Sequence, residues 1–326
     1  MAFDYSTMRG FNYQPSYASS SYEAWRWFRE DVFRRELTFG KQRFPRINTI
    51  RLWLSFDAYQ RDRNGFLDHF EKALAICHEL DLKVIACLFN RWHNHFCDNG
   101  GIFMEKLFPG TEMYDPDFFK PFLRDVCLPH RADERILIWD LCNEPFSFDC
   151  DYTQVPMLMD ALNDWLRSMS QYLHELHVTQ DVGVSLHGSL NPLLLEMVEP
   201  YSTVLMVHPY LQRIPNEKAY RLFCQQVLAH LDRQKAFAES VRKPLIVTEC
   251  CWGSIDDDVF AQNIRETLTE YGKRQIGFVA HALMESDVAD LHSPKTGAIK
   301  QDMGQFNFLD QEGRIRPGLE VFNDFC

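Results

Sequence analysis

The chain has 326 residues, of which 46% are hydrophobic and 25% are charged, a composition typical of a globular protein with a large core. Its 34 basic and 46 acidic residues give a net charge of −12, which argues against nucleic acids and anionic membranes as partners. No apolar run reaches the ~18 residues of a membrane span. The first residues lack the basic and apolar segments of a secretory signal, and the ten cysteines are scattered, so we expect a cytoplasmic protein with free thiols.

Short apolar runs alternate with amphipathic stretches along the whole chain. In chain order, the patterns predict strands at 8–13 and 49–54, a helix at 66–80, strands at 83–89 and 136–142, a helix at 155–176, strands at 182–186 and 203–207, a helix at 220–238, and strands at 245–248 and 276–280. The continuous apolar character of the strands is typical of parallel strands buried on both faces. The segment between the fifth and sixth strands is short, so we expect a reduced helix there.

The alternation of eight strands with helices predicts an α/β fold, a (β/α)8 TIM barrel formed as a single domain by residues 1–326. A doubly wound sheet is the alternative. It is less favoured because no glycine-rich phosphate-binding turn follows any of the strands.

Two glutamates stand at the C-terminal ends of apolar runs, Glu144 after the fourth predicted strand and Glu249 after the seventh. A carboxylate is not expected at the end of a buried strand unless the protein uses it. Because the C-terminal ends of all barrel strands meet at one rim, the two carboxylates are expected to face each other across the barrel mouth. Two carboxyl groups placed on either side of one sugar can break a glycosidic bond.

Other polar and aromatic residues gather at the same predicted rim. They follow or end six of the strands, and as candidate substrate-binding residues they are Arg51, Asn90, Trp92, Asn143, His208, Tyr210, Trp252 and His281. Structural roles remain open for several of them: an ion pair for Arg51, core packing for His208 and Tyr210, and packing for Trp92 and Trp252.

The motif Asn143-Glu144-Pro145, followed by a glutamate at the end of a later strand, resembles clan A glycoside hydrolases, most closely family 5 with its cellulases and mannanases. The resemblance covers nearly the whole chain and implies a retaining β-glycosidase without a cofactor. It implies that Glu144 is the acid/base and that Glu249 is the nucleophile. A proton donor needs a raised pKa, and we expect burial and the negative charge of its partner to raise the pKa of Glu144. The resemblance also implies sugar or nucleophile contacts for Asn143, Arg51, His208 and Tyr210.

Two positions depart from the family pattern. The family usually has a histidine at the end of strand three, whereas here the nearest histidine is His93. The family usually has a tryptophan at the end of strand eight, whereas residues 278–285 contain none. Trp53, Trp92 or Trp252 could supply a sugar platform instead. The departures leave the pair of glutamates intact and put the identity of the sugar in doubt.

Two further chemistries are weaker alternatives. The sequence His93-Asn-His95-Phe-Cys97 offers zinc ligands, to which Cys127 or His130 could add a fourth, but the spacing matches no standard zinc motif. Cys250 and Cys251 follow Glu249 directly and could suggest thiol chemistry, although packing is the simpler explanation.

The function predicted from the sequence is therefore hydrolysis of β-linked glycosides or short oligosaccharides. Long rim segments at 90–116 and 285–305 favour exo action, because such loops close off subsites. The alternatives are a transglycosidase, an endo-acting glucanase or mannanase, and a carbohydrate-binding barrel without catalysis. The expected partner is a carbohydrate substrate, with no metal, no nucleic acid, no membrane, and a homo-oligomer left open.

Overall fold

Eight parallel strands form a closed barrel in the computed structural model, which describes residues 3–92, 101–102, 104–107, 110–147, 156–188, 190–288 and 305–326. The strands follow each other around the barrel in chain order, and β1 pairs with β8 to close it. Their bounds are β1 Arg9–Asn12, β2 Thr49–Trp53, β3 Lys83–Cys87, β4 Ile136–Asn143, β5 Asp181–Leu186, β6 Leu205–Val207, β7 Leu245–Val247 and β8 Phe278–Ala280. The predicted TIM barrel and each predicted strand are confirmed.

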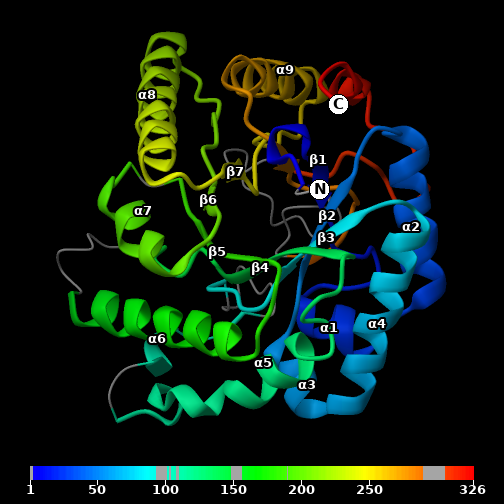
Figure 1. The fold of residues 1–326 in the computed structure, drawn as a ribbon. Helices are drawn as coiled ribbons and strands as arrows, with labels where there is room; N and C mark the ends of the chain where they lie inside the picture. Colours follow the sequence, from blue (N-terminus) through cyan, green and yellow to red (C-terminus); the bar gives the residue numbers. More distant parts are fainter. Residues whose placement is uncertain are drawn as a thin grey trace.

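A ring of helices surrounds the strands (Figure 1). The helices are α1 Ser21–Arg26, α2 Glu30–Arg43, α3 Phe56–Arg61, α4 Arg63–Glu79, α5 Lys120–Cys127, α6 Pro156–Glu175, α7 Leu193–Val198, α8 Glu217–Val241 and α9 Asp257–Arg274. The three predicted helices correspond to α4, α6 and α8. The short connection after β5 holds only the six-residue α7, as expected. Among the described residues, no helix is long and apolar enough to cross a membrane.

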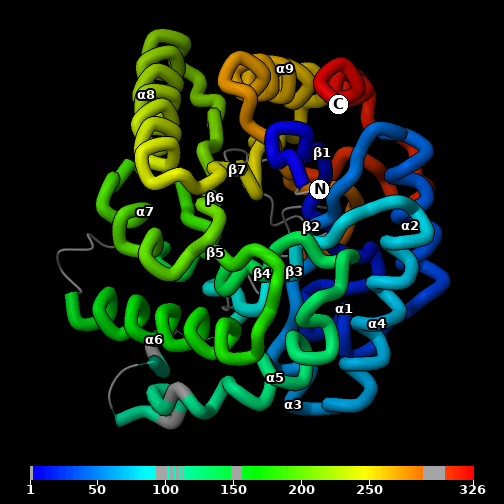
Figure 2. The backbone as a smooth tube through the Cα atoms, in the orientation of Figure 1, coloured from blue at the N-terminus to red at the C-terminus, as the bar shows by residue number. Residues whose placement is uncertain are grey.

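The end of the chain covers the barrel from outside. Residues Leu319–Asp324 form a short 3-10 helix beside α9 (Figure 2). Phe322 in this helix contacts Phe11 of β1 with ring centroids 4.5 Å apart, and it also contacts Phe308 at 5.3 Å. These rings bury apolar surface between the strands and the outer layer, which is the main stabilising contribution in such a fold.

The interior of the barrel is apolar toward the N-terminal ends of the strands. A separate cluster of buried residues fills this part, and each member lies in a strand or directly before one: Met8, Ile85, Ile138, Val204, Met206, Ile246 and Val279. Packed layers of this kind are what makes a TIM barrel a core and not a pore.

The same strands become polar toward their C-terminal ends. Side chains alternate along a strand, so a residue two positions further on points to the same side. The apolar residues Ile138, Met206, Ile246 and Val279 are followed two positions later by Asp140, His208, Thr248 and His281, all of which are buried. The inner face of the barrel therefore changes from a hydrophobic floor to a buried polar layer.

Candidate active site

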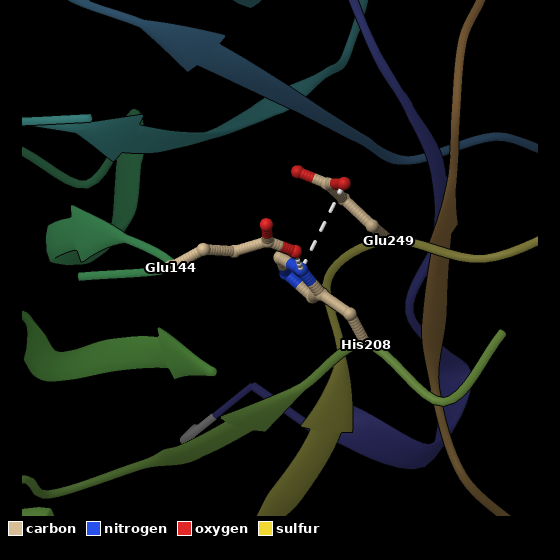
Figure 3. Close-up of side chains that lie close together, drawn as sticks. All are labelled: Glu144, His208 and Glu249. Atoms are coloured by element: carbon tan, nitrogen blue, oxygen red, sulfur yellow. Dashed lines mark hydrogen bonds and ion pairs between the residues drawn. The ribbon is translucent and has the colours of Figure 1, made fainter. Parts of the chain in front are cut away.

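The two predicted glutamates lie close together in this polar layer. Glu144 directly follows β4 and Glu249 lies two residues beyond β7. Their side chains and that of His208 point toward one another (Figure 3), and one ligand atom from each of the three lies within 4.8 Å of the other two. Both glutamates are almost fully buried, with 4% and 6% of their surface exposed.

The backbone at Glu144 turns sharply at the rim. Glu144 has a φ of 51°, in the left-handed region that non-glycine residues rarely adopt. Its N–H donates to the carbonyl oxygen of Ser185 on the neighbouring strand, at 2.8 Å. Such a conformation persists only when its surroundings hold it, and it is common at functional sites.

Glu249 is held by two strong donors. The Arg51 guanidinium donates to Oε1 at 2.7 Å, and the Tyr210 hydroxyl donates to Oε2 at 2.9 Å. Burial and the nearby carboxylates of Glu249 and Glu144 raise the pKa of Tyr210 well above its usual value, so its phenol keeps the proton that it donates. Both hydrogen bonds fix the orientation of the Glu249 carboxylate.

Arg51 connects Glu249 to the barrel wall. It is fully buried, and it forms an ion pair at 2.7 Å with Asp140, which is also fully buried. Burial alone lowers the pKa of Arg51, but the carboxylates of Asp140 and Glu249 more than offset this, and the pKa lies above its usual value. Its remaining N–H groups donate to Asn12 at 2.8 Å, Asn143 at 2.8 Å and Ser185 at 2.9 Å. The sequence left open whether Arg51 forms a structural ion pair or contacts the site. In the structure this one side chain does both.

Glu144 is held by a different pair of donors. His208 Nδ1 lies 2.6 Å from Oε1, and the Trp92 indole N–H donates to Oε2 at 2.7 Å. His208 Nε2 lies 3.0 Å from the Thr248 hydroxyl. If Nδ1 carries the imidazole proton and donates to Glu144, Nε2 can accept a hydrogen bond from Thr248.

These contacts overturn the prediction of a raised pKa at Glu144 in the ligand-free protein. Burial raises the pKa, as expected. The charge of His187 and the hydrogen bonds from His208 and Trp92 act in the opposite direction and outweigh burial, so the pKa is lowered to about 2. No sequence pattern indicates that Trp92 and His208 would converge on this carboxylate.

Asn90 and Asn143 form the neighbouring edge of the site. Asn143 Nδ2 donates to Asn90 Oδ1 at 3.0 Å. Asn90 Nδ2 is buried and has no hydrogen-bond partner among the described residues. A buried donor without a partner is costly, so this amide can bind a ligand oxygen without losing a bond within the protein.

Aromatic rings line the side of the site near Glu249. Trp252 packs on Tyr210 with ring centroids 5.3 Å apart and on Phe306 at 5.1 Å. His281 stands at the end of β8, where the family has a tryptophan, and it contacts Trp53 at 5.5 Å and Phe306 at 5.2 Å. Burial and the charge of Arg51 lower the pKa of His281 to about 3, so His281 is a neutral ring in this wall.

The structure thus brings all ten predicted site residues to one rim, and it adds five that the sequence analysis missed: Asn12, Asp140, Ser185, His187 and Thr248. Asp140 could have been found, because a charge inside an apolar strand needs a buried partner such as Arg51. His187 directly follows β5 and could have been found by examining that strand end as well. The hydrogen bonds of Asn12, Ser185 and Thr248 depend on the register of the barrel and have no sequence signal.

The structure gives limited support to the two weaker alternatives, a zinc site and thiol chemistry. His93, His95 and Cys97 lie outside the described residues. Cys127 is fully buried in the core, and burial raises the pKa of its thiol well above the usual value. Cys250 and Cys251 are also buried, with their sulfur atoms 3.6 Å apart, and burial keeps the Cys250 thiol protonated by raising its pKa. This environment favours packing over thiol chemistry.

Comparison with known proteins identifies relatives of the fold. No family model matches the sequence, and no curated protein matches it. Among solved structures, the exo-β-1,4-mannosidase Op5Man5 from Opitutaceae bacterium strain TAV5 is similar, with a TM-score of 0.74 and 18% identity over 98% of this chain and 58% of the mannosidase. The chain therefore corresponds to little more than half of that protein.

Two further structures match over a larger share of their own length. GH5_18 from Streptomyces cattleya, solved in complex with GlcNAc, has a TM-score of 0.73 and 15% identity over 97% of this chain and 79% of that one. The β-glycosidase BGL167 has a TM-score of 0.67 and 13% identity over 99% of this chain and 96% of that one. At these identities the similarity establishes the (β/α)8 fold that this chain shares with β-glycosidases.

Proposed function

We propose that the protein is a retaining β-glycosidase, with Glu249 as the nucleophile and Glu144 as the acid/base, and that residues 1–326 form its catalytic domain. The observation that supports this most directly is the pair of buried glutamates with oxygens within 4.8 Å of each other. Retaining glycosidases have carboxyl groups about 5–5.5 Å apart, whereas inverting enzymes need about 6.5–9.5 Å to leave room for a water molecule.

In the first half-reaction, Glu249 Oε2 attacks the anomeric carbon while Glu144 gives a proton to the departing oxygen. Arg51 and Tyr210 hold the Glu249 carboxylate in place by hydrogen bonds before the attack. The products are a glycosyl ester on Glu249 and the released aglycone, so the proton from Glu144 leaves with the alcohol.

In the second half-reaction, Glu144 removes a proton from water, and the resulting oxygen nucleophile attacks the anomeric carbon of the ester. The bond to Glu249 breaks, and the sugar leaves with its original anomeric configuration. Glu144 accepts hydrogen bonds from Trp92 and His208 in the ligand-free protein, which suit it to this base role. For the first step it needs a proton, so the proposal requires substrate binding to weaken at least one of these two bonds.

The substrate class follows from the edges of the site. Asn90 Nδ2 and the Asn143 side chain offer polar contacts to sugar hydroxyls, and the Trp53, Trp252 and Phe306 rings offer apolar surface. The exo-β-1,4-mannosidase among the similar structures makes β-mannosides the first glycosides to test. Exo action rests on the lengths of the rim segments 90–116 and 285–305, much of which lies outside the described residues.

The test is a screen of aryl β-glycosides (mannoside, glucoside, galactoside, xyloside and fucoside) followed by product analysis on the best sugar. We expect the β-anomer as the first product by NMR, release of single sugars from the chain end, and loss of turnover in Glu144→Gln and Glu249→Gln. The control is Glu320→Gln. Glu320 is an exposed glutamate in the 3-10 helix Leu319–Asp324, and this variant should keep full activity. Wild-type rates in both active-site variants would refute the assignment, and random internal cuts in a mannan would refute exo action alone.

A further inference from the structure

The catalytic centre also has the composition of a transition-metal site. It combines one imidazole nitrogen, from His208, with carboxylate oxygens from Glu144 and Glu249, and the three ligand atoms lie within 4.8 Å of one another (Figure 3). All three residues are buried: His208 is fully inaccessible, and the glutamates are exposed by 4% and 6%. Imidazole together with carboxylate suits zinc and its neighbours, whereas magnesium and calcium prefer oxygen ligands alone.

The spacing of the three atoms is compatible with one ion between them. His208 Nδ1 is 2.6 Å from Glu144 Oε1 and 3.7 Å from Glu249 Oε2. Ligand atoms around a tetrahedral zinc with bonds of about 2.0–2.1 Å are roughly 3.3 Å apart, which lies between these two values. The oxygens of Glu144 and Glu249 lie within 4.8 Å of each other, so side-chain rotations would have to bring all three atoms to this spacing around one ion.

The surroundings favour a dication in two ways. His208 Nε2 lies 3.0 Å from the Thr248 hydroxyl, so in the tautomer that leaves Nδ1 free for a metal, Nε2–H can donate a hydrogen bond to the Thr248 oxygen, a support common to metal-bound histidines. The charged groups of the buried network are Arg51 and the carboxylates of Asp140, Glu144 and Glu249. The three carboxylates outnumber the guanidinium of Arg51 and the nearby imidazole of His187, so the site carries an excess of negative charge that favours a cation.

We propose that the catalytic centre binds one divalent transition-metal ion, of the zinc class, through His208, Glu144 and Glu249, and that the ion excludes the substrate. Because the ion would occupy both glutamates that the proposed glycosidase reaction uses, it acts as a reversible competitive inhibitor and not as a cofactor. Metal binding does not depend on glycosidase activity, so the two proposals can fail separately.

A second histidine–carboxylate cluster provides the matched control. His130 on the outer surface lies 3.0 Å from Asp133 and 3.8 Å from Glu71. Arg135 donates to both oxygens of Asp133 and to both oxygens of Glu71, whereas Arg51 contacts Oε1 of Glu249 and leaves Oε2 without a cation. This cluster should not bind zinc, and His130→Gln should leave both zinc binding and hydrolysis unchanged.

The experiment is titration calorimetry of the whole chain with zinc chloride in a buffer that does not chelate zinc. We expect binding of one equivalent, no binding of magnesium or calcium, and a loss of affinity of more than about tenfold in His208→Gln. Glu144→Gln removes a different ligand and should show the same loss, which covers the case that His208→Gln does not fold. Zinc should raise the apparent KM for an aryl glycoside without changing kcat, and EDTA should restore activity.

Anomalous diffraction at the zinc edge gives the location directly. Density between His208, Glu144 and Glu249 supports the inference, whereas density only at surface histidines or at a cysteine overturns it. Unchanged affinity in both folded variants, or no binding by wild type, also overturns it. If zinc binds at the three residues but no aryl glycoside is hydrolysed, the proposed function fails and the metal site stands.

Discussion

The two ends of the barrel interior are built from the same strands by opposite means. Toward the N-terminal ends, Ile138 and six other apolar residues fill the barrel by packing. Toward the C-terminal ends, Arg51 and Asp140 form an ion pair with no solvent exposure, surrounded by amides, hydroxyls and the two glutamates. Packing tolerates a change of one methyl group at modest cost, whereas a buried ion pair is strongly destabilised when one partner is lost.

The difference shows how a stable fold can carry a reactive site. The apolar end needs only residues of suitable size and shape. The polar end needs each donor to meet an acceptor, and it concentrates negative charge beside Arg51. Substitutions at the two ends should therefore affect activity and stability to different degrees. Some should lower activity almost alone, and others should lower stability almost alone.

The largest effect is expected for Glu249→Ala. Loss of the nucleophile should lower kcat by about 10⁵-fold, in the range seen when a covalent catalyst is removed. Folding should be preserved, because Arg51 keeps its ion pair with Asp140. Added azide should restore turnover and give the α-glycosyl azide, which NMR identifies. Retention of most of the wild-type rate without azide would contradict the role of Glu249.

Glu144→Gln should have the next largest effect. Loss of general acid/base catalysis costs about 10²–10⁴-fold, and the cost falls mainly on substrates whose leaving group needs a proton. We expect a large drop in kcat/KM for an alkyl β-glycoside and a small drop for a dinitrophenyl β-glycoside. Equal losses on the two substrates would show that Glu144 is not the proton donor.

Arg51→Met tests the polar end as a structural element. It leaves the Asp140 carboxylate buried without its cation, which should lower the free energy of unfolding by about 3–5 kcal/mol in urea titrations. The double variant Arg51→Met/Asp140→Asn removes both charges and should recover part of this loss. A double variant no more stable than the single one would mean that the ion pair is not the source of the effect.

Trp92→Phe should change the pH dependence of activity. The indole N–H hydrogen bond favours the ionised form of Glu144, so its removal should raise the pKa of Glu144. Because the first step needs protonated Glu144, the alkaline limb of kcat/KM should move to higher pH, by about one unit for a bond of about 1.5 kcal/mol. Trp252→Phe, at a ring packed on Tyr210, is the control, and its alkaline limb should not move.

Ile138→Val tests the apolar end and should have the smallest effect. Removing one buried methylene lowers stability by about 0.5–1.5 kcal/mol. Ile138 belongs to the apolar cluster that forms the hydrophobic floor, so kcat should stay at the wild-type value. A large drop in kcat would show that the floor positions the residues above it and that the two ends are not independent.

The strands and the rim were predictable for a simple reason. Apolar runs of strand length recur eight times with helices between them, and parallel barrel strands must end at one rim. The positions of Glu144, Glu249 and Tyr210 beyond strand ends follow from this rule, whereas Arg51 lies in the middle of β2. The rule also applied to His281, whose place at the end of β8 is confirmed, with a neutral ring packed between Trp53 and Phe306.

The sequence by itself determined which residues reach the rim, because strand length and alternation are local properties of the chain. Only the tertiary structure decided what each carboxylate meets there. Trp92 and His208 come from different loops, yet both reach Glu144. Together with the charge of His187 they lower its pKa to about 2, opposite to the prediction from burial and a negative partner. The pKa of a buried group depends on donors within a few ångströms, and those are fixed by barrel register and loop path, which no local pattern encodes.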